Sequence, residues 1–500
     1  MKDSAKRKEE LLARKLERQK ERDKKELAKM LRKKARPKSR GYLGYMLFII
    51  TVVYVADEIS TQIGTQMQDV MADVIFAPIF GKEAAVSSMS ILNLVAIFVG
   101  IFSMFYKPLS DKYGRKKFLV INTIGMGIGM IIISLCTTIP VYLLGSCILT
   151  FFIPHDMQAV YIYEVAPEEK RGRFYSIAKA FATFGMLAIP VLRSAFSTYE
   201  YVDGVKVMTD INYFMVYFIP GALAVVAALL ALFFVRESDA YIDGKIRLLT
   251  MTEEEKAAEE KDKTRDTHSR GGVLSAAKYL FSHNQLKWMM LAQGVMMCGI
   301  LVTMYYTIVI NSGYESFRLT QGATVTVAEQ YGKAMTTKAL TLFAVGSGLV
   351  QLVQGFLSDA IGRKKAAIIM GALCIVTYLF VYFGPKSNWT PYLIGFLAGA
   401  SVGAYWAASD ITNLMSSESV PTNLRNSVGA VQPFLASVIF AIFYVAYMVL
   451  MGIFGDAAIG KLVLCFAAPG LAIGLAILMF KVKETKGVDL ATIKGDEFED

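Results

Sequence analysis

The 500-residue sequence is poor in charge for its length. Asp, Glu, Lys and Arg make up only 19% of its residues, whereas 54% are hydrophobic and the mean hydropathy is +0.44. This composition excludes an ordinary soluble enzyme and indicates a multispanning membrane protein. A helix that crosses the hydrocarbon core needs about 20 apolar residues, and about twelve such runs lie between residues 42 and 481.

Cysteine is also scarce. The five cysteines lie inside apolar runs and show no CxxC spacing, so they resemble small hydrophobic side chains and not a disulfide framework or a set of metal ligands. We therefore expect no metal site, no cofactor and no enzymatic activity. The chain opens with charge instead of an apolar stretch, so no cleavable signal peptide is visible and the first span should begin insertion itself.

A strand pattern is missing before the glycine-rich stretch "GMGIGM" at residues 125–130. A nucleotide-binding glycine loop follows a strand, whereas glycines within an apolar run let helices approach closely in a membrane. The stretch is therefore predicted to be a helix-packing face.

Positive charge is distributed unevenly along the chain. Residues 1–40 hold 18 Lys and Arg against 7 Asp and Glu, a surplus of 18 − 7 = +11, which equals the net charge of the whole chain. Further basic clusters lie at 107–117, 170–173 and 363–365, while the alternate loops hold few basic residues. By the positive-inside rule both termini face the cytoplasm, and we expect a multi-pass protein of the plasma membrane.

The alternate loops should then lie on the outer side. These loops are 77–85, 195–212, 311–332, 384–390 and 452–460.

Two polar segments lie outside the apolar runs. Residues 1–41 contain helix formers and no glycine before position 41, which predicts a basic cytoplasmic helix; solvation and contact with anionic lipid both remain open, and no aromatic interleaving points to nucleic acid. Residues 236–284 contain "TEEEKAAEEKDKTRD", where Thr252 and Glu255 have capping-box spacing, which predicts a surface helix in a cytoplasmic linker. The linker separates two halves, 42–235 and 285–481, and residues 482–500 form a cytoplasmic tail.

The two halves repeat each other. "SDKYGRKK" at 110–117 returns as "SDAIGRKK" at 358–365, "EVAPEEKRGR" from Glu164 is matched by "ESVPTNLRNS" from Glu418, and "VRES" from Val235 is matched by "VKET" from Val482. Three matches at nearly one offset indicate duplicated halves, an architecture of transporters that hold substrate between the halves near the membrane midplane.

These motifs resemble those of the major facilitator superfamily, and most closely its sugar-porter branch. The chain contains forms of GxLxDxxGRK, ExxPxxxRG and, as "ETKGVDLATI" from Glu484, the tail motif of sugar porters. Lys107 departs from the glycine that usually begins the first of these. The resemblance implies an all-α membrane protein with twelve transmembrane helices in two six-helix halves around a central cavity, which acts as a transporter.

The resemblance also implies a role for the charged motifs. In the family an acid at a helix end accepts hydrogen bonds from a neighbouring helix N-terminus, pairs with a loop arginine, and latches the halves on the cytoplasmic side. The alternative is that these charges only fix topology. The residues assigned to the latch are Asp111, Gly114, Arg115, Glu164, Arg171, Gly355, Asp359, Gly362, Arg363, Glu418 and Arg425.

Ionisable residues inside the spans are candidates for substrate binding or proton coupling, because a charge costs about 3 kcal/mol at mid-membrane unless it faces partners or water. The first helix holds Asp57 and Glu58 on adjacent polar faces. In this respect the chain resembles proton-coupled sugar porters, which often carry an acid at this place in their first helix. The arginine that those porters carry on the fourth helix is missing from this sequence. The candidate set is Asp57, Glu58, Gln62, His155, Asp156, Lys179, Arg193, Tyr305, Tyr306 and Trp406.

Several alternatives remain open at these positions. Asp57 or Glu58 could belong to a structural ion pair, Lys179 could pair with Asp156, and Arg193 could extend to the outer interface. The glutamines that sugar porters carry on the fifth and seventh helices are replaced by Lys179, Val295 and Met296. A Lys and an Arg on one face would suit a carboxylate-bearing substrate.

The sequence therefore predicts a monomeric secondary transporter of a small polar metabolite, either sugar-related or an organic anion. We expect a proton as coupling ion, the lipid bilayer as surroundings, and no nucleic-acid partner. A facilitator, a drug exporter and a membrane sensor of the same fold are the alternatives.

Overall fold

The computed structural model describes residues 2–35, 41–106, 109–153, 157–158, 161–162, 171–202, 205–251, 273–420 and 425–486. Within them, eleven helices are long and apolar enough to cross a membrane, and a shorter apolar helix spans Ile139–Phe152. These helices match the apolar runs of the sequence. The predicted all-α membrane fold is therefore confirmed.

The first half of the bundle is built from the segments between residues 42 and 234. Its first span continues past a break at Met67 through a short π-helix, and Pro78 lies in the first turn of the following helix, where its missing N–H is not needed. Its elements are α2 (Tyr42–Gln66), α3 (Gln68–Met71), the π-helix Ala72–Phe76, α4 (Ala77–Phe80), α5 (Ala85–Leu92), α6 (Leu94–Tyr106), α7 (Leu109–Tyr113), α8 (Arg115–Ser134), α9 (Ile139–Phe152), α11 (Arg171–Gly185), α12 (Ala188–Ala195) and α13 (Tyr213–Phe234).

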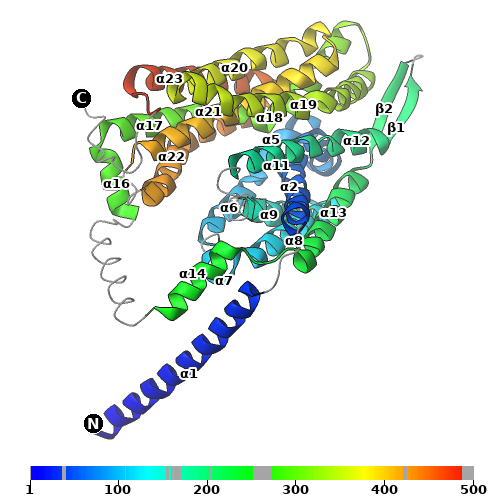
Figure 1. Cartoon of the computed structure of the whole chain (residues 1–500). Helices are drawn as coiled ribbons and strands as arrows, with labels where there is room; N and C mark the ends of the chain where they lie inside the picture. Colours follow the sequence, from blue (N-terminus) through cyan, green and yellow to red (C-terminus); the bar gives the residue numbers. More distant parts are fainter. Residues whose placement is uncertain are drawn as a thin grey trace.

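The second half follows the linker and packs as a layer of long helices (Figure 1). The first span of this half, which is the seventh of the chain, is continuous through a 3₁₀ turn at Met297–Gly299. Its elements are α16 (Val273–Ser282), α17 (Asn284–Met296), α18 (Ile300–Thr320), α19 (Val325–Ile361), α20 (Arg363–Phe383), α21 (Pro391–Glu418), α22 (Arg425–Phe454) and α23 (Ile459–Lys481).

Glycines bring helices close within the first half. Gly127 of α8 faces α13, where an added Cβ would lie 2.8 Å from the carbonyl oxygen of Gly221. Gly129 of the same stretch faces α9, where a Cβ would lie 2.9 Å from the backbone nitrogen of Leu149. The prediction that "GMGIGM" is a helix-packing face is confirmed.

Several of the predicted outside loops contain secondary structure. The segment 77–85 holds α4 and a 3₁₀ turn, and the segment 195–212 holds an antiparallel hairpin of β1 (Ser197–Val202) and β2 (Val205–Ile211). The sequence offered a signal, since residues 203–204 are Asp-Gly, a strong hairpin turn dipeptide. The segment 311–332 was also predicted to be a loop, but only residues 321–324 separate α18 from α19.

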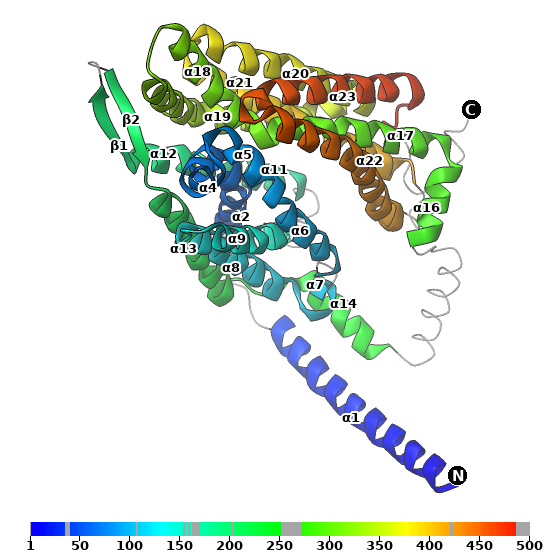
Figure 2. The same cartoon turned by 180° about the vertical axis from the view of Figure 1, so that it is seen from behind.

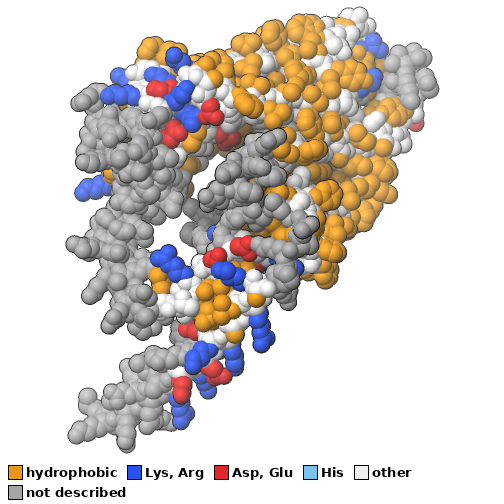
Figure 3. Space-filling model, in the orientation of Figure 1, with side chains coloured by type: hydrophobic (Ala, Val, Ile, Leu, Met, Phe, Trp, Pro, Cys, Tyr) orange, Lys and Arg blue, Asp and Glu red, His pale blue; other side chains and the backbone are white. Residues whose placement is uncertain are grey.

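The two ends of the bundle differ in character. We call the end that carries β1 and β2 the hairpin end, and the opposite end, which carries the charged motifs after α7 and α19, the motif end. The halves meet at the hairpin end and diverge toward the motif end in both views (Figures 1 and 2). Hydrophobic side chains cover the flanks of the bundle, and charged side chains gather at the motif end and along the terminal helix (Figure 3).

The basic N-terminal segment forms α1 (Lys2–Lys34), as predicted, and projects from the motif end (Figure 1). Its last turns contact α14 (Asp239–Thr250) of the linker through Lys34 and Asp243 at 2.7 Å and through Glu26 and Lys245 at 3.7 Å. Met30 is buried at this contact. The helix predicted around Thr252 lies outside the described residues.

Candidate functional site

A buried ion pair joins two spans of the first half at the hairpin end. Arg193 of α12 donates to both carboxylate oxygens of Asp69 of α3, each at 2.8 Å. The side chains of Arg193 and Asp69 are 0% and 1% exposed. Because a desolvated charge is tolerated only with a close partner, each residue requires the other. The structure therefore shows Arg193 in an internal ion pair, which is neither of the two roles that the sequence left open.

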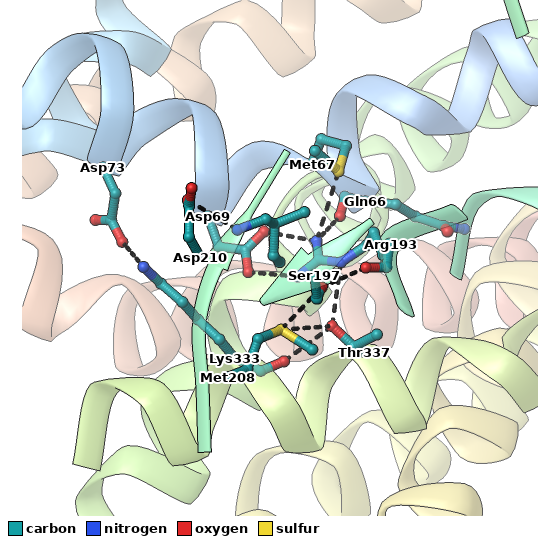
Figure 4. A network of polar contacts seen from close by, with 11 residues as sticks. Gln66, Met67, Asp69, Asp73, Arg193, Ser197, Met208, Asp210, Lys333 and Thr337 are labelled. Atoms are coloured by element: carbon teal, nitrogen blue, oxygen red, sulfur yellow. Dashed lines mark hydrogen bonds and ion pairs between the residues drawn. The ribbon is translucent and has the colours of Figure 1, made fainter. Parts of the chain in front are cut away.

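The same guanidinium reaches the second half. Arg193 Nε donates to Thr337 Oγ1 of α19 at 3.3 Å, and Arg193 also donates to the carbonyl oxygen of Gln66, where α2 ends and its last carbonyls need partners. Figure 4 shows Arg193 between the first span on one side and Thr337 on the other. One side chain thus contacts the broken first span, α12 and the opposite half.

Ion pairs surround this centre and cross between the halves. Lys333 Nζ of α19 lies 2.5 Å from Asp73 Oδ2 of the π-helix, and Lys82 Nζ lies 2.5 Å from Glu329 Oε2 of α19. Both pairs are partly exposed, so each contributes less than about 1 kcal/mol by itself. Together they place complementary charge on the two faces that meet at the hairpin end.

A helix cap also crosses the seam. Asp456, just before α23, accepts hydrogen bonds from the backbone N–H groups of Val86 at 2.7 Å and Ser87 at 2.8 Å. These groups lie in the first turn of α5, where helix N–H groups lack partners and a carboxylate is favoured. The second half therefore caps a helix of the first.

At the motif end, the first half closes its charged loop on itself. Gly114 has φ +112, a conformation that glycine adopts readily, between α7 and α8. Glu237 Oε1 accepts from the backbone N–H of Lys116 at 2.9 Å, and Arg115 donates to Ser110 Oγ at 3.0 Å. The acid on the N-terminus of α8 thus comes from the end of the same half.

The second half repeats this geometry. Gly362 has φ +103 between α19 and α20, and Glu484 accepts from the backbone N–H groups of Arg363 at 2.8 Å and Lys364 at 3.1 Å. Arg363 donates to Ser358 Oγ at 2.9 Å, as Arg115 does to Ser110. The repeated "VRES" and "VKET" segments therefore supply equivalent caps.

The predicted role of the motif acid is corrected in one respect. Asp359 pairs with the loop arginine, since Arg363 NH1 lies 2.5 Å from Asp359 Oδ1, but the carboxylate at the start of α20 is that of Glu484. Arg363 Nε also lies 3.4 Å from Glu418 Oε1, and Thr485 Oγ1 donates to Glu418 at 2.6 Å. All these contacts stay within the second half.

The remaining candidate latch residues make no further polar contact that can be described in this part of the chain. Gly355 lies on the exposed side of α19, and an added Cβ there would meet nothing within 4 Å. Six predicted residues, or their side chains, lie outside the described residues: Asp111, His155, Asp156, Glu164, Arg171 and Arg425.

A cavity of about 300 Å³ lies against the first span and is lined mainly by residues of the first half, with Met304, Tyr305 and Tyr444 from the second half. Gln68 and Asn93 line it, and Gln68 Oε1 and Asn93 Oδ1 have no hydrogen-bond partner within the described part of the chain. A buried polar atom without a partner is costly unless a ligand or water supplies one. The described lining is uncharged: Ser60, Thr61, Gly64, Thr65, Gln68, Met89, Ser90, Asn93, Ala96, Ile97, Ile133, Tyr142, Ser146, Leu149, Thr150, Ile153, Tyr217, Met304, Tyr305 and Tyr444.

The acids of the first helix lie below this cavity, toward the motif end. Asp57 is 6% exposed, and its Oδ2 accepts from Gln158 Nε2 of the fourth span at 2.9 Å. Glu58, Gln62 and Lys179 are partly exposed. Gln158 was not among the candidates that the sequence indicated, and it lies C-terminal to residues 142–149, where related proton-coupled porters were expected to carry an arginine.

The second half contributes a chain of amides that the sequence analysis also missed. Gln432 Nε2 donates to Gln293 Oε1 at 3.0 Å, Gln293 Nε2 donates to Asn413 Oδ1 at 2.9 Å, and Ser416 donates to Gln432 Oε1. Gln293, Asn413 and Trp406 line a second cavity of about 120 Å³. Gln293 lies two residues before Val295, the first of the two positions at which sugar porters carry glutamines on this helix.

The tyrosine pair of the seventh span connects the two cavities. Ile300 lines the smaller cavity and Tyr305 the larger one, so the cavities follow each other along this span. Tyr306 is buried and stacks on Phe343 of α19, with ring centroids 4.5 Å apart. Trp406 is 38% exposed at the smaller cavity.

Comparisons with known proteins agree with this architecture. A glucose transporter of Staphylococcus epidermidis is 30% identical over 141 residues, which cover 27% of this chain and 30% of that protein. An arabinose-proton symporter of Bacillus subtilis is 23% identical over 365 residues, which cover 69% of this chain and 72% of that protein. The match to the first relative thus covers under a third of its length.

The solved structure of the xylose transporter from E. coli in an inward open conformation has the same fold. It superposes with a TM-score of 0.56 at 16% identity and covers 90% of this chain and 98% of its own. The family model of the Major Facilitator Superfamily matches residues 41–432. The prediction of a transporter fold, and not of an enzyme, is therefore confirmed. The chain belongs to the Major Facilitator Superfamily.

Proposed function

We propose that the protein is a secondary transporter of a neutral polyhydroxyl compound of the sugar class, which it moves by alternating access. The observation that carries this proposal is the uncharged lining of the 300 Å³ cavity, where Gln68 and Asn93 offer unpartnered amide oxygens. Sugar hydroxyls both donate and accept hydrogen bonds, so they match a wall of amides and hydroxyls. The printed names of the relatives, glucose transporter and arabinose-proton symporter, agree with this class.

The structure argues against an organic anion at this cavity. An anion would need a free cation, and Arg193 is already bonded to Asp69 and buried away from the cavity lining. A neutral ligand avoids the cost of transferring a charge into a site without a counter-charge. Of the two substrate classes that the sequence left open, we therefore select the sugar-related one.

We further propose that a proton is the coupling ion and that Asp57 carries it. Asp57 is buried beside the neutral amide of Gln158. An ionisable side chain inside a span is a candidate proton carrier, because it can bind and release a proton when its surroundings change between two states. Alternation between the two states would then load and release one proton for each substrate.

The moving units of this proposal are the halves 42–235 and 285–481, joined by the linker 236–284. We place the motif end, both termini, the N-terminal helix 1–41 and the tail 482–500 in the cytoplasm of a cell with the protein in its plasma membrane, because Lys and Arg concentrate there. Anionic lipid would attract the basic N-terminal helix. We also propose that it acts as a monomer, because both halves of the transporter fold belong to one chain.

The direct test is uptake into proteoliposomes. We expect accumulation of at least one of D-glucose, L-arabinose or D-xylose, increased by an inwardly directed pH gradient, and no accumulation of lactate or citrate. Gln68→Ala should lower affinity for the sugar, whereas Ile97→Ala, an apolar change in the same lining, should have a smaller effect. Uptake of the organic anions alone would contradict the proposed substrate class.

A further inference from the structure

We propose that Arg193 is a positioning residue that connects the sugar cavity to closure of the hairpin end. This inference rests on the proposed transport function but concerns residues outside the cavity lining. The guanidinium contacts the first span through Asp69 and the Gln66 carbonyl, and the second half through Thr337. No other role for Arg193 accounts for all three contacts at once.

The first step concerns the broken first span. Gln66 and Asp69 flank Gln68, whose side chain is 8% exposed and lines the cavity with an unpartnered oxygen. Arg193 fixes the backbone on one side of Gln68 and the carboxylate on the other. Because a helix break leaves backbone groups without partners, this segment needs external donors to hold one conformation. Arg193 supplies them and thereby orients Gln68.

The second step concerns the seam between the halves. Thr337 belongs to α19, so its bond to Arg193 Nε exists only while the halves are together at the hairpin end. If the halves separate there, this bond breaks and water reaches the ion pair. The conformation of the first span and the closure of the seam thus both depend on the planar guanidinium of Arg193. A lysine carries a point charge and cannot make the same set of hydrogen bonds.

The third step concerns electrostatic balance. The charged groups that face the pair come from several elements: Lys333 of α19 acts on Asp69, and Lys333 itself is bonded to Asp73 of the π-helix. Tyr217 of α13 and Tyr306 of α18 complete the enclosure. Arg193 and Lys333 thus face Asp69 and Asp73, and Glu315 of α18 adds a further carboxyl group near Lys333.

The experiment measures closure directly. Spin labels at Ile79 of α4 and Val325 of α19, both more than 60% exposed, report the distance between halves at the hairpin end. Thr337→Val removes the bond between Thr337 and Arg193, together with the contacts of the same hydroxyl to the Lys333 carbonyl oxygen and Met208 Sδ, and leaves the Arg193–Asp69 pair in place. Because a hydrogen bond to a charged group contributes at least about 1.4 kcal/mol, which corresponds to a factor of ten, the ratio of open to closed populations should rise about tenfold or more.

Thr341→Val is the matched control, since it makes the same change one turn away on α19 and Thr341 bonds only to its own helix. It should leave the distance distribution unchanged. Arg193→Lys should both open the hairpin end and raise the Kd for D-glucose, L-arabinose or D-xylose, whichever the protein transports. Distributions for Thr337→Val and Thr341→Val that both match the wild type would overturn the inference. The distances require no substrate, so failure of sugar uptake alone would contradict the proposed function and not this inference.

Discussion

The two ends of the bundle use similar residues to opposite effect. At the hairpin end, polar groups of one half bind the other: Lys333 binds Asp73, Lys82 binds Glu329, and Asp456 caps α5. At the motif end, each half binds its own groups, with Glu237 on α8 and Glu484 on α20. The repeated motifs therefore stabilise each half separately. The contacts between the halves lie at the hairpin end, which is the closed end.

This difference shows where the motif charges act. Within one half they fix the loop between two spans, and Arg363 retains Asp359 and Glu418 as its partners while the motif end is apart. We propose that these carboxylates become available to the opposite half when the hairpin end opens. Substitutions at the two ends of the bundle are expected to affect stability and transport to different degrees.

The largest effect is expected from the buried pair at the hairpin end. Asp69→Asn leaves Arg193 buried without a counter-charge, which costs about 3–5 kcal/mol. Thermal unfolding in detergent should show a lower Tm and sugar uptake should be lost. The double variant Asp69→Asn/Arg193→Gln removes both charges and should recover much of the Tm. A single variant with unchanged Tm would contradict the buried pair.

Substitution of Asp57 is expected to have a large effect on gradient-driven accumulation and little effect on sugar exchange. Asp57→Asn should abolish accumulation driven by a pH gradient while sugar exchange across the membrane continues, because exchange requires no net proton movement. Uptake with and without the gradient, compared with counterflow, measures both. Glu58→Gln is the matched control, since it lies about 100° away on the helix. Full gradient-driven accumulation in Asp57→Asn would exclude this site.

A moderate effect is expected at the motif end. Asp359→Asn and Asp111→Asn should lower the transport rate more than sugar affinity, because we assign both residues to the balance of states and Asp359 lines neither cavity. Stopped-flow uptake and equilibrium binding separate the two quantities. Loss of binding with normal alternation would contradict a latch.

A smaller and symmetrical effect is expected from the two helix caps. Glu237→Gln and Glu484→Gln each weaken a carboxylate bond to a helix N-terminus, a contribution of about 1 kcal/mol. Because the two halves repeat, the two variants should lower Tm by similar amounts. A large effect of one cap alone would show that the halves are not equivalent at the motif end.

The smallest effect is expected from the terminal helix. Deletion of residues 1–34 removes the exposed ion pairs between α1 and α14, and such pairs contribute little. Uptake by correctly inserted protein should stay near the wild-type rate. Correct insertion without uptake would favour a regulatory or sensory role for this segment.

The sequence predicted features that depend on local pattern. Apolar runs predicted the spans, and the repeated motifs led to the loops in which Gly114 and Gly362 adopt positive φ. The partners Arg193 and Asp69 were missed as a pair because they are distant in sequence and meet only where the first span breaks. Gln158 and Gln293 were missed for a similar reason, since a buried amide has no periodic signature in an apolar run.

Our central claim is that the uncharged cavity binds sugar and opens toward the motif end while the hairpin end is closed. Thiol labelling tests this claim most directly. Thr61→Cys, in a chain whose five native cysteines are replaced, places one thiol in the cavity lining. A membrane-impermeant maleimide should label it from the motif side of oriented vesicles, and the transported sugar should protect it. Labelling from the hairpin side alone, or labelling that no sugar slows, would contradict the account.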